Sequence, residues 1–202
     1  DLSIVGDGQA TLPCLIEAVK EQLDASRRRQ IATRAERWKT AHAAKRSADI
    51  EAARYAWDAS PISTARMCME LWDLVKDEDW VVGNGDLRGW VQRLWDIKHP
   101  YQDVSARGGG GLGEGLGHAI GVALANRDKG RLTINIQSDG DMLFTPAALW
   151  TAVHHHIPML IVMYNNRTYG NDLGHQGTMA QVRGRPEENK TIGIDISDPN
   201  VD

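Results

Sequence analysis

The chain has 202 residues, of which 42% are hydrophobic and 25% are charged, as is usual for a soluble globular protein. Its net charge of −4 gives no basic footprint for nucleic acid or for an acidic membrane surface. No apolar run approaches the ~20 residues that span a bilayer, and the chain opens without the basic segment of a signal peptide. Cys14 and Cys68 form neither a metal-type nor a redox-type pair, so we expect both to be reduced and packed. We therefore expect a cytoplasmic protein with no nucleic-acid and no membrane partner.

The first part of the chain predicts two pieces. Residues 2–5 are typical of a short strand, and a helix is expected to begin near Thr11. Residues 1–24 therefore look like the C-terminal tail of a central α/β domain that would precede them. Residues 25–60 are rich in Ala, Arg, Lys and Glu and poor in large apolar residues, which predicts a solvated helical linker between two bodies.

Residues 61–202 predict a second domain, which we expect to be truncated at its C-terminus. In chain order its expected elements are a helix over 64–75, a strand over 80–82, a helix over 88–95, a strand over 102–104, a helix ending near 126, a strand over 132–136, a helix over 145–156, a strand over 159–163 and an irregular loop over 168–188. This alternation of strands and helices predicts an α/β fold in which helices flank a parallel sheet.

Polar side chains follow two of these strands at the point where each strand ends. The strand over 132–136 leads into Ser138-Asp139-Gly140-Asp141, and the strand over 159–163 leads into Asn165-Asn166. Thr145 and Pro146 fit the start of the helix between them. Two strands joined by one helix are expected to be parallel and neighbouring, so Asp139 and Asn166 should share one edge of the sheet. A carboxylate and an amide oxygen at that edge suit a hard cation such as Mg²⁺ that also holds a phosphate ligand.

A glycine run precedes these strands, with seven glycines between residues 108 and 117. Glycine allows the backbone to approach a ligand closely, and the run leads into an apolar helix whose first amides could face an anion or a heterocycle. The spacing Gly108-x-Gly110-x-x-Gly113 also matches the dinucleotide fingerprint, although its preceding strand is poor. A dinucleotide-binding oxidoreductase therefore stays open as an alternative, and it predicts binding to a nicotinamide ligand without Mg²⁺.

These motifs, in this order, resemble those of the thiamine-diphosphate (ThDP) enzymes of the acetolactate synthase, benzaldehyde lyase and benzoylformate decarboxylase group. The Gly-Asp-Gly to Asn-Asn signature of that family is matched by Ser138-Asp139-Gly140 and Asn165-Asn166. The glycine run resembles the loop over the pyrimidine ring of the cofactor. Asn84-Gly85 through Trp90 looks like the loop that touches the diphosphate. The resemblance implies that residues 61–202 have the ThDP-binding fold of a diphosphate-binding domain.

The resemblance assigns the metal and the diphosphate to a small set of residues. Asp139 and Asn166 would give side-chain oxygens, and Thr168 its carbonyl, to Mg²⁺ or Ca²⁺. Gly140 and Asp141 would offer backbone amides to the diphosphate of ThDP. Asp141 stands where the family has a small residue, so its carboxylate should point away, be paired, or help to hold the metal.

The resemblance assigns the rest of the cofactor to other positions. The carbonyl of Gly110 would accept a hydrogen bond from the 4′-amino group, and Leu112 would force the cofactor into its bent shape. Gly85 and Gly170 would also line the cofactor. Asp86-Leu87 stands where relatives often have Gln-His.

The resemblance places no catalytic residue in these 202 residues. The family activates ThDP with a glutamate of its pyrimidine-binding domain, which would come from a missing region or from another subunit. The chain alone is therefore expected to be inactive, and the complete enzyme is expected to be a homodimer or homotetramer.

The implied activity is that of a lyase or transferase, an acetolactate synthase-like enzyme that decarboxylates a 2-keto acid or ligates carbonyl compounds to an acyloin. An oxalyl-CoA decarboxylase-like lyase is the alternative within the class. A non-catalytic interaction protein that kept the fold is an alternative of another class, and it need not bind ThDP.

Three further groups of residues have two interpretations each. His154-His155-His156 cannot share one metal ion, because adjacent helical residues point about 100° apart, and it suits a helix C-terminus. Arg27-Arg28-Arg29 is interleaved with acidic residues, which favours a solvated helix over a nucleic-acid patch. Four residues after the metal loop could line a substrate pocket or belong to a mobile loop: Asn171, Asp172, His175 and Gln176.

Overall fold

The computed structural model describes residues 3–85, 87, 89–105 and 111–198. The chain divides into two compact units, Asp1–Asp49 and Ile50–Asp202. Each unit is described by itself.

The first unit is helical. Helix α1 covers Gly8–Glu21 and begins at Asp7, whose Oδ1 accepts a 2.8 Å hydrogen bond from the amide of Ala10. Helix α2 covers Ala25–Ala53, so its last four residues belong to the second unit, and Asp24 Oδ1 accepts from the amide of Arg27 at 2.7 Å. The helix expected over 25–60 is thus confirmed as far as Ala53. The strand expected over 2–5 is wrong for residues 3–5, which have no regular structure, and Leu2 lies outside the described residues. A single short strand with no partner to pair with gains no ladder hydrogen bonds.

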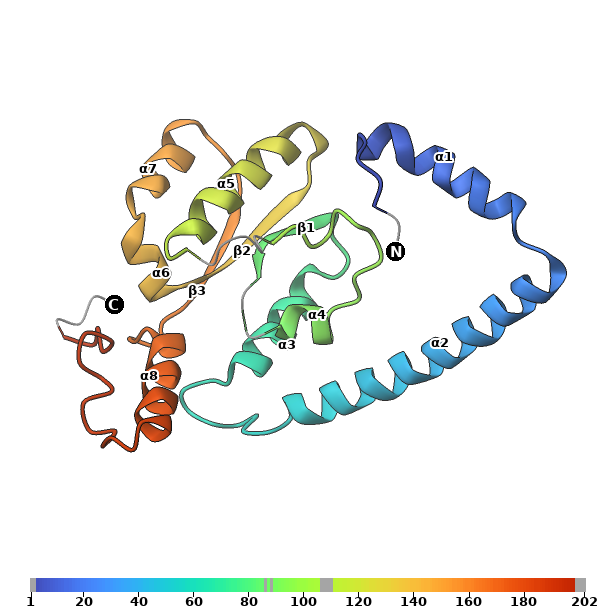
Figure 1. Cartoon of the computed structure of the whole chain (residues 1–202). Coiled ribbons are helices and arrows are strands. Elements are labelled where there is room, and N and C mark those ends of the chain that lie inside the picture. Colours follow the sequence, from blue (N-terminus) through green and yellow to red (C-terminus); the bar gives the residue numbers. More distant parts are fainter. Residues whose placement is uncertain (1–2, 86, 88, 106–110, 199–202) are drawn as a thin grey trace. The chain divides into compact units, whose positions relative to one another are not determined.

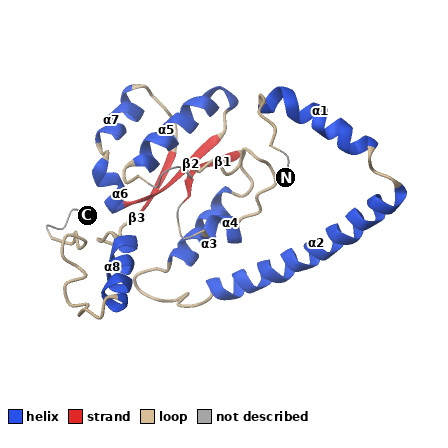
Figure 2. Cartoon of the chain, viewed as in Figure 1, coloured by secondary structure: helices blue, strands red, loops and turns tan. Residues whose placement is uncertain are grey.

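The second unit is built on a parallel sheet (Figure 2). Its strands are β1 (Trp80–Gly85), β2 (Leu132–Ser138) and β3 (Leu160–Tyr164), and their order in the sheet is β1-β2-β3. Trp80 pairs with Leu132, and Ile134 pairs with Leu160. The predicted parallel α/β sheet is therefore confirmed. The strand expected over 102–104 is reduced to a single parallel bridge between Val82 and Asp103.

Helices cover both faces of this sheet (Figure 1). On one face lie α3 (Thr64–Val75) and α4 (Trp90–Leu94), and on the other lie α5 (Glu114–Asn126) and α7 (Ala147–His154). Helix α5 comes close to β1 at Gly83, where an added Cβ would lie 3.1 Å from the Cα of Ala119. The 3₁₀ turn Arg127–Lys129 follows α5, helix α6 (Asp139–Phe144) follows β2, and helix α8 (Gly170–Val182) follows β3.

Tryptophan dominates the core beneath α3 and α4. The rings of Trp72, Trp80 and Trp95 lie with their centroids 5.3–5.7 Å apart, two of the pairs in edge-on geometry. The indole of Trp95 donates a 3.0 Å hydrogen bond to the carbonyl of Cys68. Burial raises the pKa of the Cys68 thiol to about 12, so it stays protonated. Cys14, in contrast, is exposed, so the expectation that both cysteines are packed is wrong for that residue.

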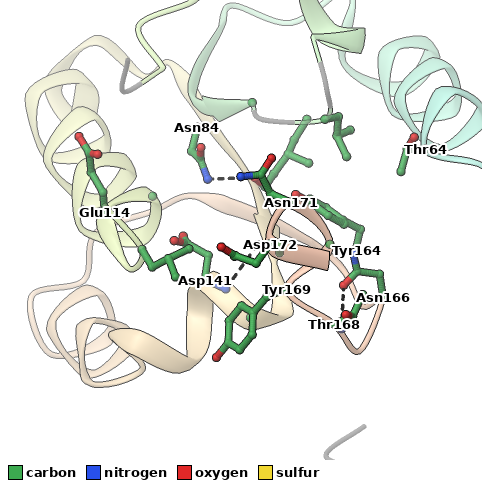
Figure 3. A pocket seen from close by; sticks show the side chains of 18 of the residues that line it. Thr64, Asn84, Glu114, Asp141, Tyr164, Asn166, Thr168, Tyr169, Asn171 and Asp172 are labelled. Atoms are coloured by element: carbon green, nitrogen blue, oxygen red, sulfur yellow. Dashed lines mark hydrogen bonds between the residues drawn. The ribbon is translucent and has the colours of Figure 1, made fainter. Parts of the chain in front are cut away.

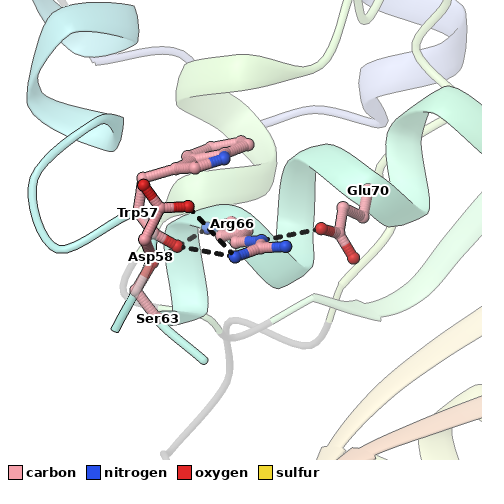
Figure 4. A network of polar contacts seen from close by, with 5 residues as sticks. All are labelled: Trp57, Asp58, Ser63, Arg66 and Glu70. Atoms are coloured by element: carbon pink, nitrogen blue, oxygen red, sulfur yellow. Dashed lines mark hydrogen bonds and ion pairs between the residues drawn. The ribbon is translucent and has the colours of Figure 1, made fainter. Parts of the chain in front are cut away.

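A polar network ties the segment before α3 to that helix (Figure 4). Ser63 begins α3, and its hydroxyl accepts from the amide of Arg66. The Arg66 guanidinium donates to the carbonyl of Trp57 at 2.9 Å and to Glu70 Oε1 at 2.7 Å, and lies 3.7 Å from Asp58. One arginine thus joins the preceding turn to the first two turns of the helix.

Two predictions on the carboxyl side of the sheet need correction. The helix expected over 145–156 is shorter in the structure and covers only Ala147–His154 (α7). The hydroxyl of Thr145 donates to the carbonyl of Gly113 instead of capping the helix, and Pro146 is the N-cap. The loop expected over 168–188 contains helix α8. Gly177 is the one buried residue of this helix, so its sequence has no apolar period from which a helix could be predicted. Side-chain hydrogen bonds, such as that from Gln181 to Glu187, stabilise it instead. None of the helices in the described ranges is both long and apolar enough to cross a bilayer.

Candidate cofactor site at the carboxyl edge of the sheet

The predicted metal ligands leave neighbouring strands at the same edge. Ser138, the last residue of β2, pairs with Tyr164, the last residue of β3. Asp139 therefore follows the end of one strand, and Asn166 lies two residues beyond the end of the other. Parallel pairing brings their loops together, as the hydrogen bond from the Arg167 amide to Asp139 Oδ2, at 2.8 Å, shows directly.

The loop over 165–168 has a specific backbone shape. Arg167 takes a left-handed conformation, with φ of 53°, which turns its amide toward Asp139. Asn166 Oδ1 accepts a 3.1 Å hydrogen bond from the amide of Thr168. A short antiparallel contact supports the loop from behind, because Tyr169 donates to the carbonyl of Ile194 and Ile196 donates to that of Arg167. The oxygens of this loop are thus held in place by backbone hydrogen bonds.

The donor set fits a small, hard cation. Asp139 is 7% exposed, and its Oδ1 is buried without a hydrogen-bond partner among the described residues. A buried carboxylate oxygen without a partner is costly, and a bound cation would remove that cost. Asn166 Oδ1 keeps acceptor capacity beyond its single bond, and nowhere in the described ranges does a group donate to the carbonyl of Thr168. These three oxygens are of the type that Mg²⁺ or Ca²⁺ prefers. No group of three or more His, Cys, Asp or Glu suited to a metal occurs in the described part of the chain.

A cavity of about 1140 Å³ opens above this edge (Figure 3). Its wall combines the end of β1, the exit of the glycine run, the turn after β2 and the loop after β3. Six of the predicted cofactor residues line it: Gly85, Leu112, Gly140, Asp141, Asn166 and Gly170. Thr168 lines it as well, whereas Asp139 is buried at the start of α6, beside the cavity. Gly110, the remaining predicted residue, lies outside the described residues.

The described end of the glycine run shapes one side of the cavity. Leu112 lines the wall and is 52% exposed, so it is not a core residue. Gly113 has a φ of 89°, and a Cβ there would lie 2.8 Å from Phe144 Cβ and 2.9 Å from Thr145 Cγ2. Only glycine fits this position without strain. Leu87 also contributes to the lining of the cavity, although it is only 1% exposed and packs in the core, and Asp86 lies outside the described residues.

Helix α8 supplies a polar wall. Asn171, Asp172, His175 and Thr178 line the cavity, in keeping with helical spacing on one face. Of the four residues for which a pocket was one interpretation, Gln176 alone is absent from the lining. The cavity thus combines oxygens suited to a hard cation, exposed backbone and a polar helix face, which suits an anionic ligand held through a cation.

A chain of amide side chains, two of them buried and one half-buried, was missed from the sequence. Asn84, Asn135 and Gln137, here called the amide ladder, run from β1 across β2. Asn84 Nδ2 donates to Asn135 Oδ1 at 3.0 Å, and Asn135 Nδ2 donates to Gln137 Oε1 at 3.1 Å. Gln137 Nε2 then donates to Asp141 Oδ2, while Asp141 Oδ1 accepts from the amide of Gly113. The signal in the sequence is a polar residue at every second position of β2, from Thr133 to Gln137, in a strand that is otherwise apolar.

The comparisons with known proteins identify the family of this chain. The family model "Thiamine pyrophosphate enzyme, C-terminal TPP binding domain" matches residues 83–199, which is more than half of the chain. The chain belongs to the thiamine pyrophosphate enzyme family, and these residues form its C-terminal TPP-binding domain. TPP and ThDP are two names for the same cofactor.

Curated relatives and solved structures fall in the same family. The chloroplastic acetolactate synthase of Arabidopsis thaliana is 31% identical over 88 residues, which is 44% of this chain and 13% of that protein. The large subunit of acetolactate synthase isozyme 3 of Escherichia coli K12 is 25% identical over 221 residues, covering 99% of this chain and 36% of that protein. The chain thus spans only a minor part of these relatives.

The structural neighbours share the fold. The ThDP-dependent 4-hydroxybenzoylformate decarboxylase of Rhodococcus jostii RHA1 has a TM-score of 0.57 and 27% identity, over 71% of this chain and 25% of that one. The benzoylformate decarboxylase of Polynucleobacter necessarius has the same TM-score at 22% identity, over 72% of this chain and 26% of its own. The fold predicted from the sequence is therefore confirmed at the level of the family.

Proposed function

We propose that this chain is the diphosphate-binding part of an enzyme that uses ThDP and Mg²⁺ to cleave or form carbon–carbon bonds next to a carbonyl group. The observation that carries the proposal is the buried Oδ1 of Asp139, which has no hydrogen-bond partner in the described part of the chain and lies beside the loop of Asn166. We assign Asp139, Asn166 and the carbonyl of Thr168 to the cation. When bound, ThDP supplies a thiazolium ring that stabilises a carbanion on the substrate.

The residues of this chain would bind and orient. The Asp139 carboxylate would give the cation its anionic ligand, and the amides of Gly140 and Asp141 at the start of α6 would be offered to a diphosphate held by that cation. The Asp141 amide makes a long bond of 3.4 Å to the hydroxyl of Ser138, which the diphosphate would share or replace. Gly140 has no room for a side chain, since a Cβ would lie 2.7 Å from the ring of Tyr169. The close contact keeps this turn packed and its backbone near the cavity.

The substrate end of the reaction is proposed from the relatives. Their names include acetolactate synthases and a 4-hydroxybenzoylformate decarboxylase, which favours 2-keto acids or acyloins as substrates here. We place the activating glutamate outside these 202 residues, in a pyrimidine-binding domain of the complete polypeptide or of a second subunit in a homodimer or homotetramer. Residues 1–24 and 25–60 are proposed as the tail of a central domain and a helical linker. On this proposal the chain by itself turns over no substrate.

The test compares cofactor binding with and without the anionic ligand. Calorimetry on the full-length protein is expected to show ThDP binding that requires Mg²⁺ and that Asp139→Ala abolishes, because the variant removes the charged metal ligand. Asp128→Ala, which removes an exposed carboxylate after α5, is the matched control and is expected to bind normally. Unchanged ThDP affinity in Asp139→Ala would refute the assignment.

The same protein distinguishes the competing classes. Turnover of pyruvate or benzoylformate by the ThDP-loaded protein would support the proposed chemistry, and turnover of oxalyl-CoA instead would support the alternative lyase. A protein that binds no ThDP in the presence of Mg²⁺ would be an interaction protein that kept the fold. Binding of NAD without Mg²⁺ would instead indicate the dinucleotide site.

A further inference from the structure

The carboxylate of Asp141 faces protein donors on two sides. Gln137 Nε2 and the amide of Gly113 each donate to one of its oxygens at 2.5 Å. These donors come from β2 and from the exit of the glycine run, two segments 24 residues apart in sequence. Asp141 therefore joins the central strand to the loop that forms the opposite wall of the cavity.

Gly113 is held at both of its backbone groups. Its amide donates to Asp141, and its carbonyl accepts a 2.9 Å hydrogen bond from the hydroxyl of Thr145. Gly113 is the N-cap of the 13-residue helix α5 and has no side chain to cap that helix. Asp141 accepts from the amide of the N-cap residue itself, as the N3 side chain does in a capping box, and its negative charge suits the positive end of the helix dipole.

The amide ladder has one direction. Each side-chain nitrogen donates toward Asp141, from Asn84 to Asn135, from Asn135 to Gln137 and from Gln137 to the carboxylate. An ionised carboxylate only accepts, whereas a primary amide can present either its oxygen or its nitrogen. The acceptor at the end therefore sets which way the buried amides of Gln137 and Asn135 point. Asn84, at the end of β1, meets the oxygen of Asn135 in this way, and its Nδ2 also donates to the carbonyl of Ile136 at 3.0 Å.

Mispaired hydrogen-bonding groups in the amide ladder would be costly, because two of its three members are buried. Asn135 and Gln137 are both fully buried. Gly115 is packed against the ladder, since a Cβ there would lie 2.6 Å from Asn84 Nδ2 and 2.8 Å from Asp141 Oδ2. A donor facing a donor in this space would leave two buried groups unpaired. No water fits between the groups to repair such a mismatch at these contact distances.

We propose that Asp141 is a positioning residue of the cofactor site: its carboxylate locks the exit of the glycine run at Gly113 and, through the amide ladder, turns the oxygen of Asn135 toward Asn84, which the carbonyl of Ile136 also holds beside Gly85. This inference rests on the proposed ThDP function. It means that the extra carboxylate of this chain is neither a metal ligand nor a charge opposed to the diphosphate. It fixes the side of the cavity next to Leu112 relative to the side next to Gly85.

The test reverses one end of the ladder and then restores it. Asp141→Asn keeps an acceptor for Gly113 but places an NH₂ group opposite the NH₂ of Gln137. The pair Asp141→Asn with Gln137→Glu moves the carboxylate one step along the ladder and makes every donor meet an acceptor again. Asp128→Asn is the same chemical change on an exposed residue and serves as the control.

Calorimetry on the full-length protein should show a ThDP affinity lowered roughly tenfold or more in Asp141→Asn, the scale expected for a buried unpaired polar group. The double variant should recover most of this loss. The Mg²⁺ concentration at half-saturation, measured at saturating ThDP, should stay within about twofold of wild type. Failure of the double variant to recover, together with a shifted Mg²⁺ requirement, would overturn the proposal in favour of a metal ligand.

A readout without cofactor separates this proposal from the function on which it rests. Amide hydrogen exchange of residues 111–117, measured on the ligand-free full-length protein, should quicken in Asp141→Asn and return toward wild type in the double variant. If wild type fails to bind ThDP, the proposed function fails, and unchanged exchange in both variants would overturn the positioning role independently. Because both variants keep side-chain volume, a folded protein is expected for each, as circular dichroism would check.

Discussion

Two carboxylates flank Gly140, and the structure treats them in opposite ways. Asp139 uses one oxygen for the amide of Arg167 and leaves the other buried without a partner among the described residues. The two oxygens of Asp141 accept hydrogen bonds from the amide of Gly113 and from the side chain of Gln137. A carboxylate that binds an ion needs an oxygen without a hydrogen bond from the protein. A carboxylate that belongs to the structural framework of the site has both oxygens bonded to protein donors. Residue type alone does not distinguish these roles, but the pattern of hydrogen bonding does.

The largest effect is expected where the framework holds the glycine run. Gly113→Ala places a Cβ at a φ of 89° and within 3 Å of Phe144 and Thr145. The left-handed conformation costs about 1–2 kcal/mol for a residue other than glycine, and forced repacking costs about 1–3 kcal/mol. Urea unfolding of the ligand-free protein should therefore show a free energy of unfolding lowered by about 2–5 kcal/mol. A loss below about 1 kcal/mol would contradict this prediction, because it would mean that the atoms around residue 113 move aside at little cost.

The elements that could be predicted from the sequence are those in which the period of the apolar residues and the capping residues indicate the same structure. The helix Thr64–Val75 forms with the predicted bounds, and the strands that flank the Asp139 turn are present, parallel and adjacent. Helix α8 was not predicted because it packs by glycine contact and polar side chains rather than by an apolar face. Short polar helices of this kind give no periodic signal.

The site was readable only in part, for a related reason. Asp139 and Asn166 could be placed on one edge because strand ends in a parallel sheet share an edge. The amide ladder could not be predicted, because it depends on the strand register that sets Asn84 opposite Asn135. It depends also on α5 covering the polar face of β2, which in a sheet open to water on one side would simply be solvated.

The next effect compares the two carboxylates directly, without ligand. Asp141→Ala leaves the buried donors of Gly113 and Gln137 unpaired, so the free energy of unfolding should fall by about 1–3 kcal/mol. Asp139→Ala loses the hydrogen bond from the Arg167 amide but also removes a buried oxygen that has no partner among residues 3–85, 87, 89–105 and 111–198, so its change should stay within about 1 kcal/mol. Denaturant unfolding of both variants checks this difference.

Adding ThDP and Mg²⁺ should then separate the two variants in the other direction. Wild type should gain stability by ligand linkage, whereas Asp139→Ala should gain none. Equal losses for both variants in the ligand-free protein would show that Asp139 belongs to the framework after all.

The smallest effect is expected at the other end of the glycine run, and it has the opposite sign. Gly117 is exposed within α5, and a Cβ there meets no atom within 4 Å. Alanine should therefore raise the free energy of unfolding of the ligand-free protein by about 0.5–1 kcal/mol through helix propensity alone. A loss of stability would contradict the open space around this residue. Weaker ThDP binding despite the higher stability would show that the cofactor approaches the backbone at Gly117, which would extend the ligand-facing part of the run beyond the segment that Asp141 holds.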